Sequence, residues 1–137
     1  MKYFLQSLML FSLLITSCNK DSNADLAANS SLKNINSLSE YNTNIADGVS
    51  MLFFHATWCP KCAAQRPAIE GLLGDSSLGE VFFGQVDYEK VTDVVQTAKV
   101  QGFPTIVFYK NGTEAARFSG QGHSKEKIKD QLLDLME

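Results

Sequence analysis

The chain has 137 residues and a formal net charge of −3, with 45% hydrophobic and 20% charged residues. This length accommodates one domain and a leader, and the composition is that of an ordinary globular protein. The small negative charge argues against nucleic-acid binding through bulk electrostatics. His55 and His123 are the two histidines, and neither combines with the three cysteines in a zinc-binding spacing, so we expect no metal site.

Residues 1–17 are typical of a secretion signal, with Lys2 as the positive start and an apolar stretch over 3–15. That stretch is shorter than the roughly 20 residues that a transmembrane helix needs. It ends in Leu-Ile-Thr-Ser before Cys18, an order that resembles the signal of a bacterial lipoprotein. We therefore expect a lipid on Cys18 and a place in the bacterial cell envelope, facing the periplasm or the exterior. Ordinary signal-peptidase cleavage and an uncleaved anchor are the alternatives.

The cysteine count supports lipidation of Cys18. Three cysteines leave one over when Cys59 and Cys62 pair, and an odd free thiol is a liability in a secreted protein. The segment 18–31 is rich in Asn, Ser, Ala and Asp and cannot bury enough apolar surface to order itself, so we expect a flexible tether. Residues 32–137 form the predicted folded domain.

Helical and extended patterns alternate at the start of this domain. Four apolar residues lie near helical spacing and predict a helix within 32–46: Ile35, Leu38, Tyr41 and Ile45. A short strand over 32–35 before this helix is an open alternative. The continuous apolar run 49–55 is of strand length, and it predicts a buried strand.

Residues 58–62 read Trp-Cys-Pro-Lys-Cys and precede a helix-compatible segment, 63–73. This order places Cys59 at a helix N-terminus, where unpaired backbone N–H groups and the helix dipole stabilise a thiolate. Lys61 adds a positive charge, and Cys62 can attack a mixed disulfide formed at Cys59. We expect an exposed, attacking Cys59 and a buried, resolving Cys62. A structural disulfide or half of a metal site is the alternative, although no second cysteine pair completes such a site.

The remaining chain predicts further strands and helices in turn. Pro67 should kink the helix over 63–73, and Gly74 is its expected C-terminal cap. A strand over 79–87, an amphipathic helix over 91–98 and a strand over 105–109 follow. An Asn-Gly hairpin at 111–112 leads into a strand over 113–118, and a helix over 124–137, capped by Ser124, ends the chain. This order predicts an α/β fold in which a mixed sheet has helices on both faces.

Four motifs make the chain similar to the thioredoxin family over residues 49–137. They are Trp58-Cys59-Pro60-Lys61-Cys62 after a strand, Pro67, Gly102-Phe103-Pro104-Thr105, and Asn111-Gly112 followed by Gly120. The resemblance implies a thioredoxin-like fold and a cis-Pro104 that faces the cysteine pair. It also implies a substrate groove formed by Trp58, Pro60, Lys61, Phe103, Pro104 and Gly120. Trp58 has the alternative of a core aromatic.

The sequence departs from that family at the buried carboxylate beneath the cysteines, because Phe53 occupies its position. The lysine that accompanies this carboxylate is replaced by Gln85. Losing both charges together is consistent, since either one buried alone is costly. The proton acceptor for Cys62 is therefore water or another group. His55 is a candidate for that role, with simple packing as the alternative.

These patterns predict a thiol–disulfide oxidoreductase outside the cytoplasmic membrane, which reduces disulfides of exported proteins through Cys59 and Cys62. No cofactor is expected, because the dithiol is itself the redox group. The expected partners are protein dithiols and disulfides, a redox partner that supplies electrons, and a membrane reached through the lipid on Cys18. We expect a monomer. A disulfide oxidase or isomerase, and a non-catalytic binding module with the same fold, are the alternatives.

Overall fold

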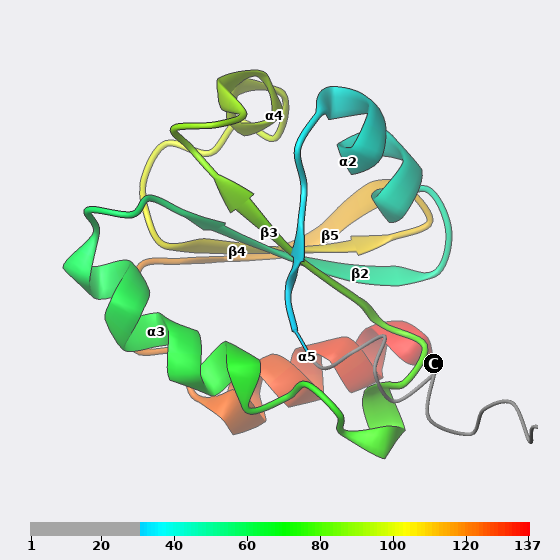
Figure 1. Cartoon of the computed structure of the whole chain (residues 1–137). Helices are drawn as coiled ribbons and strands as arrows, with labels where there is room; N and C mark the ends of the chain where they lie inside the picture. The colour runs from blue at the N-terminus through cyan, green and yellow to red at the C-terminus, as the bar shows by residue number, and fades with distance from the viewer. Residues whose placement is uncertain (1–30) are drawn as a thin grey trace, which may run out of the picture.

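A five-stranded mixed sheet lies at the centre of the computed structural model, which describes residues 31–137 (Figure 1). Its order is β1-β3-β2-β4-β5, with β1 and β2 parallel to β3, and with β4 antiparallel to both β2 and β5. The strands are β1 (Lys33–Asn34), β2 (Val49–His55), β3 (Phe82–Asp87), β4 (Thr105–Lys110) and β5 (Thr113–Ser119). The predicted signal peptide, the predicted lipidation at Cys18 and the tether up to residue 30 lie outside the described residues.

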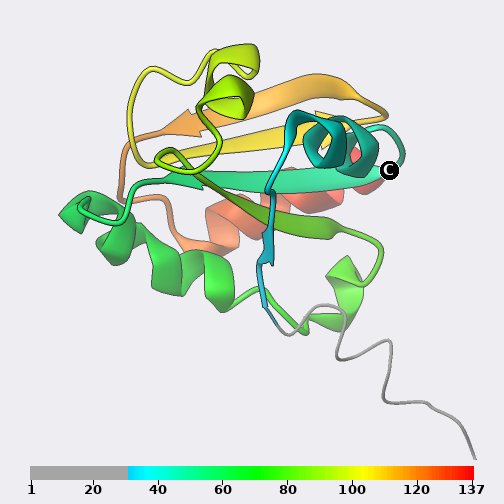
Figure 2. The ribbon, with the colours of Figure 1, turned by 45° about the horizontal axis from the view of Figure 1, so that its top comes forward.

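Helices cover both faces of the sheet, as predicted. Figures 1 and 2 show one pair above it and one pair below it. The upper pair is α2 (Leu38–Ile45) and α4 (Thr92–Thr97), and the lower pair is α3 (Pro60–Glu70) and α5 (Lys125–Met136). A short 3-10 helix, η1 (Ser76–Leu78), precedes β3. None of the helices between residues 31 and 137 combines the length and apolar character that crossing a membrane requires.

The central strand β2 divides the hydrophobic core in two. Successive side chains of a strand point to opposite faces, so Met51 and Phe53 join the core under α3 and α5. Leu52 and Phe54 join the core under α2 and α4. All four side chains are fully buried, which explains why β2 reads as an unbroken apolar run.

Helix boundaries differ from the prediction at α2 and α3. The helix expected within 32–46 begins only at Leu38, where the Ser37 side chain accepts a hydrogen bond from the Glu40 N–H. The strand left open before it is confirmed as β1. The helix expected over 63–73 begins at Pro60, whose ring suits a first helical position, and ends at Glu70, so Gly71 rather than Gly74 follows it.

The Asn-Gly turn joins β4 to β5, as predicted. Asn111 and Gly112 have φ values of 51° and 81°, the left-handed pair that a two-residue hairpin turn requires. The Asn111 side chain also accepts a hydrogen bond of 2.9 Å from the Gly48 N–H. The turn is thus fastened to the residue that precedes β2.

The described chain begins beside the C-terminal half of α3. Ser31 and Leu32 line one cavity of about 340 Å³ with Glu70 and Leu73. Residue 31 therefore lies near the end of α3 that is opposite Cys59, the residue that caps its beginning.

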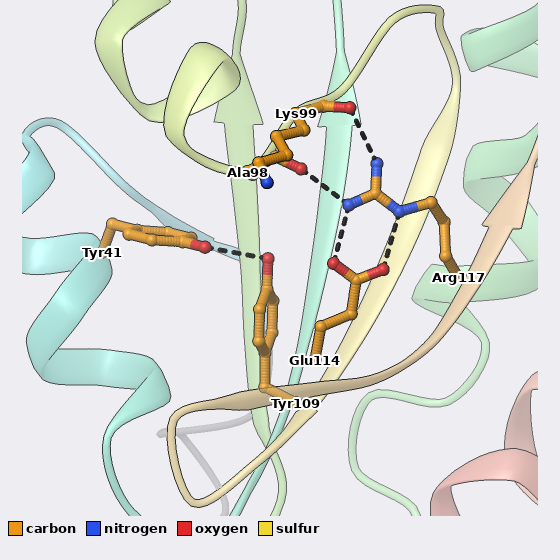
Figure 3. Close-up of polar contacts among 6 residues, drawn as sticks. All are labelled: Tyr41, Ala98, Lys99, Tyr109, Glu114 and Arg117. Atoms are coloured by element: carbon orange, nitrogen blue, oxygen red, sulfur yellow. Dashed lines mark hydrogen bonds and ion pairs between the residues drawn. The ribbon is translucent and has the colours of Figure 1, made fainter.

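A polar cluster stabilises the face of the sheet under α2 and α4 (Figure 3). The hydroxyls of Tyr41 and Tyr109 lie 3.0 Å apart, and the two rings meet edge to face. Burial is the main cause that raises the pKa of Tyr109, and its bond to Tyr41 raises that pKa further. Tyr109 therefore stays neutral, and its hydrogen bond with Tyr41 joins α2 to β4.

Arg117 ties β5 to the C-terminal end of α4 (Figure 3). Its guanidinium donates to the carbonyl oxygens of Ala98 and Lys99, at 2.6 and 3.1 Å, which a helix leaves unpaired at this end. It also donates two hydrogen bonds to the Glu114 carboxylate, at 2.7 and 2.8 Å. These bonds are the main cause that lowers the pKa of Glu114 below its usual value of 4.5.

Candidate redox site

Cys59 caps the N-terminus of α3 with its own sulfur. Its backbone is extended, Pro60 takes the first helical position, and the Cys62 N–H donates a hydrogen bond to the Cys59 sulfur at 3.1 Å. This placement confirms the predicted position of Cys59 at a helix start. A backbone donor and the positive end of the helix dipole together stabilise negative charge on that sulfur when the pair is reduced.

Cys59 and Cys62 form a disulfide, with Cα atoms 5.3 Å apart. This distance lies within the range that a disulfide needs. The expected contrast in exposure is wrong for this oxidised form, because Cys59 is 7% exposed and Cys62 is 3% exposed. Both pack in the core under α3 and α5, since the sulfur of Cys59 turns inward to cap the helix and bond Cys62. Cys59 is still the more accessible of the two.

The surface around the disulfide carries the other residues of the Trp-Cys-Pro-Lys-Cys motif. Trp58 is 64% exposed, which excludes the alternative that it is a core aromatic. Pro60 and Lys61 are exposed on the first turn of α3. A large apolar ring that stands in solvent next to a disulfide is suited to contact another protein chain.

The Phe103–Pro104 peptide bond is cis, as the resemblance implied. Because Thr105 pairs with Phe54 near the end of β2, this loop lies at the same end of the sheet as the cysteine motif. The Gly120 N–H donates a hydrogen bond of 2.8 Å to the Pro104 carbonyl and so fixes one loop against the other. Phe103, Pro104 and Gly120 line a single open cavity of about 380 Å³, and the structure thus brings these three predicted residues together.

A second, smaller cavity of about 230 Å³ lies against the disulfide. Its walls include Cys59, Cys62, His55 and Arg66. Arg66 is a part of the site that the sequence reasoning missed, although it lies four residues after Cys62 and therefore on the same face of α3. That spacing was the available signal. No group of three His, Cys, Asp or Glu residues in the described part of the chain is placed to hold a metal ion.

The ring of Phe53 supports both polar residues of this cavity. The His55 ring stacks on it, with centroids 5.4 Å apart and planes 15° apart. The Arg66 guanidinium lies 5.1 Å from the centre of the same ring. Arg66 also donates hydrogen bonds to Gln85 at 3.0 Å and to Glu70 at 3.3 Å. An arginine thus joins the two positions, Phe53 and Gln85, at which the chain departs from the family pattern.

Burial lowers the pKa of His55 below its usual value of 6.5. The positive charge of Arg66 lowers it next, and Lys90 has a smaller effect in the same direction. The carboxylate of Asp87 opposes this shift. The imidazole is therefore neutral at pH 7 and can accept a proton.

The helix-capping disulfide and the adjoining cis-proline loop, on a mixed sheet covered on both faces, define the class of protein. It is a thiol–disulfide oxidoreductase with a thioredoxin-like fold. The family model described as Thioredoxin matches residues 31–134, which is most of the chain. The chain belongs to the thioredoxin family, and the resemblance drawn from its motifs is confirmed.

Individual relatives agree with this assignment. Thioredoxin-2 of Saccharomyces cerevisiae is 38% identical over 88 residues, which make up 63% of this chain and 83% of that protein. Thioredoxin of Ictalurus punctatus is 34% identical over 101 residues, or 72% of this chain and 94% of that one. Both relatives are matched over most of their own length.

Solved structures support the fold. Malassezia sympodialis thioredoxin gives a TM-score of 0.70 at 24% identity and is covered over 93% of its chain, with 79% of this chain matched. Thioredoxin from Trypanosoma brucei brucei gives 0.68 at 20% identity, with 77% of this chain and 95% of that chain matched. At such identities the likeness concerns the architecture alone.

Proposed function

We propose that this thioredoxin-family protein is a lipoprotein of a bacterial cell envelope and reduces disulfides in exported proteins. The observation that carries this proposal is the leader, in which an apolar stretch over 3–15 ends in Leu-Ile-Thr-Ser before Cys18. A lipid on Cys18 accounts for the one cysteine that does not belong to the redox pair. It also holds the redox domain close to a membrane, because the tether reaches at most about 50 Å when fully extended.

The proposed reaction begins when the Cys59 thiolate attacks a substrate disulfide. One substrate sulfur leaves as a thiolate and the other remains bonded to Cys59 as a mixed disulfide. Cys62 then attacks Cys59, forms the intramolecular disulfide and releases the second substrate thiolate. Two electrons pass from the protein to the substrate, and a dithiol partner must return them. Both sulfurs come from one chain, so a monomer suffices.

The substrate surface in this proposal is the exposed rim around the disulfide and the cis-proline loop. Trp58, Pro60 and Lys61 supply the rim on the side of α3. Phe103, Pro104 and Gly120 line a cavity at the same end of the sheet. An extended peptide segment around a disulfide fits such a surface, because loop backbone groups and exposed rings bind chains with little regard to sequence.

Two variants separate activity from location. In Cys59→Ser, the rate of insulin reduction by dithiothreitol, followed as turbidity, should fall to the rate without protein. The variant should stay in the membrane fraction. Cys18→Ala should do the reverse, releasing the protein from membranes and ending incorporation of labelled palmitate while leaving insulin reduction intact. An unchanged rate in Cys59→Ser would count against catalysis by Cys59. A parent protein with no rate above that without protein would support the binding-module alternative. A Cys18→Ala protein that remained membrane-bound through its leader would show a helical anchor instead.

The direction of electron flow is tested by equilibration with glutathione redox buffers, using the chain with Cys18→Ser so that only the redox pair titrates. A potential of about −270 mV is that of a reductase and about −120 mV that of an oxidase. We expect a value near the reducing end. A value near the oxidising end would make the protein a disulfide oxidase, and the proposed reduction of exported proteins would be wrong.

A further inference from the structure

The cavity beside the disulfide contains one side chain that can take up and release a proton near neutral pH. Its walls include both cysteines, His55 and Arg66, while Ala56, Thr57 and Ala63 complete the lining. The arginine keeps its charge at all relevant pH values, and the hydroxyl of Thr57 is no base. His55 is therefore the one group of this lining suited to receive the proton of a cysteine thiol.

We propose that His55 is the base that takes the proton from Cys62 when Cys62 resolves the mixed disulfide. The inference rests on redox exchange at the Cys59–Cys62 pair and is independent of the proposed location and direction. It assigns to His55 the task that a carboxylate at the position of Phe53 would otherwise perform.

The placement of His55 follows from the strand that bears it. Phe53 and His55 are two residues apart on β2, so their side chains point to the same face, toward α3 and the cysteines. The stack on the buried Phe53 ring fixes the plane of the imidazole. None of the residues that the structure describes hydrogen-bonds this imidazole, so its nitrogens are available to a thiol or to a water in the cavity.

His55 also borders a further cavity, which gives a proton a route to solvent. It lines this cavity, of about 250 Å³, together with Arg66, Asp87 and Lys90. Asp87 and Lys90 come from the end of β3 and the turn after it, and Arg66 comes from α3; these are the charged groups that face the imidazole. Burial first, and then the positive charges of Arg66 and Lys90, lower the pKa of His55 and favour its neutral form before the reaction, while the negative charge of Asp87 opposes them. A proton taken from Cys62 can leave through this further cavity.

The Cys62 S–H proton moves to an imidazole nitrogen, directly or through one water. The resulting thiolate forms a bond to the Cys59 sulfur, and the bond from Cys59 to the substrate sulfur breaks. The substrate sulfur departs with the electron pair as a thiolate. The imidazolium then returns its proton to that thiolate or to water, and the Arg66 charge helps because it disfavours a positive His55 and favours a negative Cys62.

The test separates the two thiol steps in the full chain in detergent, with Cys18→Ser. The reduced protein reacts with 5,5′-dithiobis(2-nitrobenzoate), which releases one thionitrobenzoate when Cys59 attacks and a second when Cys62 resolves. Both releases are followed by absorbance in a stopped-flow instrument from pH 5 to pH 9. In the parent protein, the rate constant of the second release should be nearly level above neutrality. It should fall below an inflection that lies under pH 6.5, the ordinary pKa of histidine.

Two variants remove the base in different ways. His55→Phe keeps a ring on Phe53, and His55→Gln keeps a polar group. In both, the second release at pH 7 should be about 10- to 100-fold slower, in the lower part of the range for general base catalysis. It should rise about tenfold per pH unit, because only the spontaneously ionised thiol then reacts. The first release should change less than about twofold, since Cys59 is activated by the helix start and not by His55.

His123→Gln is the matched control, because it removes the other histidine. The backbone of His123 bonds the Gln65 side chain, so those bonds survive the change, and both releases should keep the parent rates. A parent profile that rises steadily with no inflection would overturn the inference even if neither variant folds. Parent rates in both His55 variants would overturn it as well. A parent protein that gave no second release at all would instead refute redox exchange at the pair.

Discussion

The two faces of the sheet each carry a polar cluster built around aromatic rings, and the clusters differ in what they leave free. On the face under α2 and α4, Tyr41 bonds Tyr109, and Arg117 bonds Glu114 and the end of a helix (Figure 3). On the face under α3 and α5, His55 stacks on Phe53 without a hydrogen bond from any residue that the structure describes. The polar groups of the first cluster bond one another. In the second cluster, the imidazole nitrogens beside the disulfide have no hydrogen-bond partner among the residues that the structure describes.

This difference separates stability from chemistry. A buried hydroxyl or guanidinium with all its partners in place stabilises one arrangement of the chain, and its removal is felt as a loss of stability. An imidazole with free nitrogens beside a reactive sulfur contributes little to stability but can move protons. We therefore expect changes on the α2 and α4 face to alter unfolding, and changes at His55 to alter rates.

The largest expected loss of stability is at the aromatic support of the redox face. Phe53 is fully buried, so Phe53→Ala should lower the free energy of unfolding by about 3–5 kcal/mol, the usual result of emptying an aromatic core site. Phe53→Leu, which fills most of the space, should cost less than half of that. Urea unfolding followed by circular dichroism measures both. A loss below about 1 kcal/mol for Phe53→Ala would mean that this core repacks around the gap.

The next effect is at the tyrosine pair. Tyr41→Phe leaves the buried Tyr109 hydroxyl without its partner, which should lower the free energy of unfolding by about 1–3 kcal/mol. Replacing both tyrosines by Phe should recover part of this loss, since no hydroxyl is then left unpaired. Tyr41→Phe, Tyr109→Phe and the double variant form a double-mutant cycle in urea. Insulin reduction should stay at the parent rate. A slower rate would show that the tyrosine pair affects the redox site, contrary to the separation of stability and chemistry between the two faces.

A smaller effect is expected at Arg117. Arg117→Lys keeps the charge but cannot donate to Glu114 and to both carbonyls, so the loss should be about 1 kcal/mol, the scale of a partly exposed bidentate pair. Glu114→Gln keeps the helix-end contacts and serves as the matched control, with a smaller loss expected. Thermal unfolding ranks the two, and a larger loss for Glu114→Gln would show that the ion pair, not the helix end, dominates.

The smallest effect is the pH dependence of stability, which the two clusters divide between them. The folded state lowers the pKa of His55, so the stability that comes from its neutral form is present above pH 6.5 and is lost as the pH falls through the folded-state pKa. Glu114 also has a lowered pKa, and its contribution is present above pH 4.5 and lost below it. His55→Gln should flatten the first interval and leave the second. Urea midpoints between pH 4 and pH 8 measure this, and a His55→Gln protein that kept the first interval and lost the second would contradict the prediction.

The parts of the fold that were predicted from the sequence are those set by local backbone chemistry. The Asn111-Gly112 pair has few conformations besides a tight hairpin, and it forms one. The apolar run of β2 is long enough for a central strand and too short for a helix that crosses the core. The position of Cys59 at a helix start is equally local, although the prediction began the helix at residue 63 and did not use the preference of Pro60 for the first helical position.

The errors arise where a local signal competes with a distant one. Ile35 fits the helical spacing of the residues after it, yet its N–H donates a hydrogen bond to the Gln85 carbonyl across the sheet. The helix therefore begins only after the cap at Ser37. Arg66 was overlooked for a similar reason. Its spacing from Cys62 placed it on the right face of α3, but its partners Phe53 and Gln85 come from two different strands, and no sequence pattern joins it to them.

The position of residue 31 beside the far half of α3 has a geometric consequence for a protein held at a bilayer. Helix α3 has 11 residues and is therefore about 16 Å long, and its two ends lie beside different features of the molecule. The chain arrives at one end while the sulfurs sit at the other. In the proposed lipoprotein, the tether therefore enters the domain on the side away from the disulfide and leaves the reactive sulfurs clear of the point of entry.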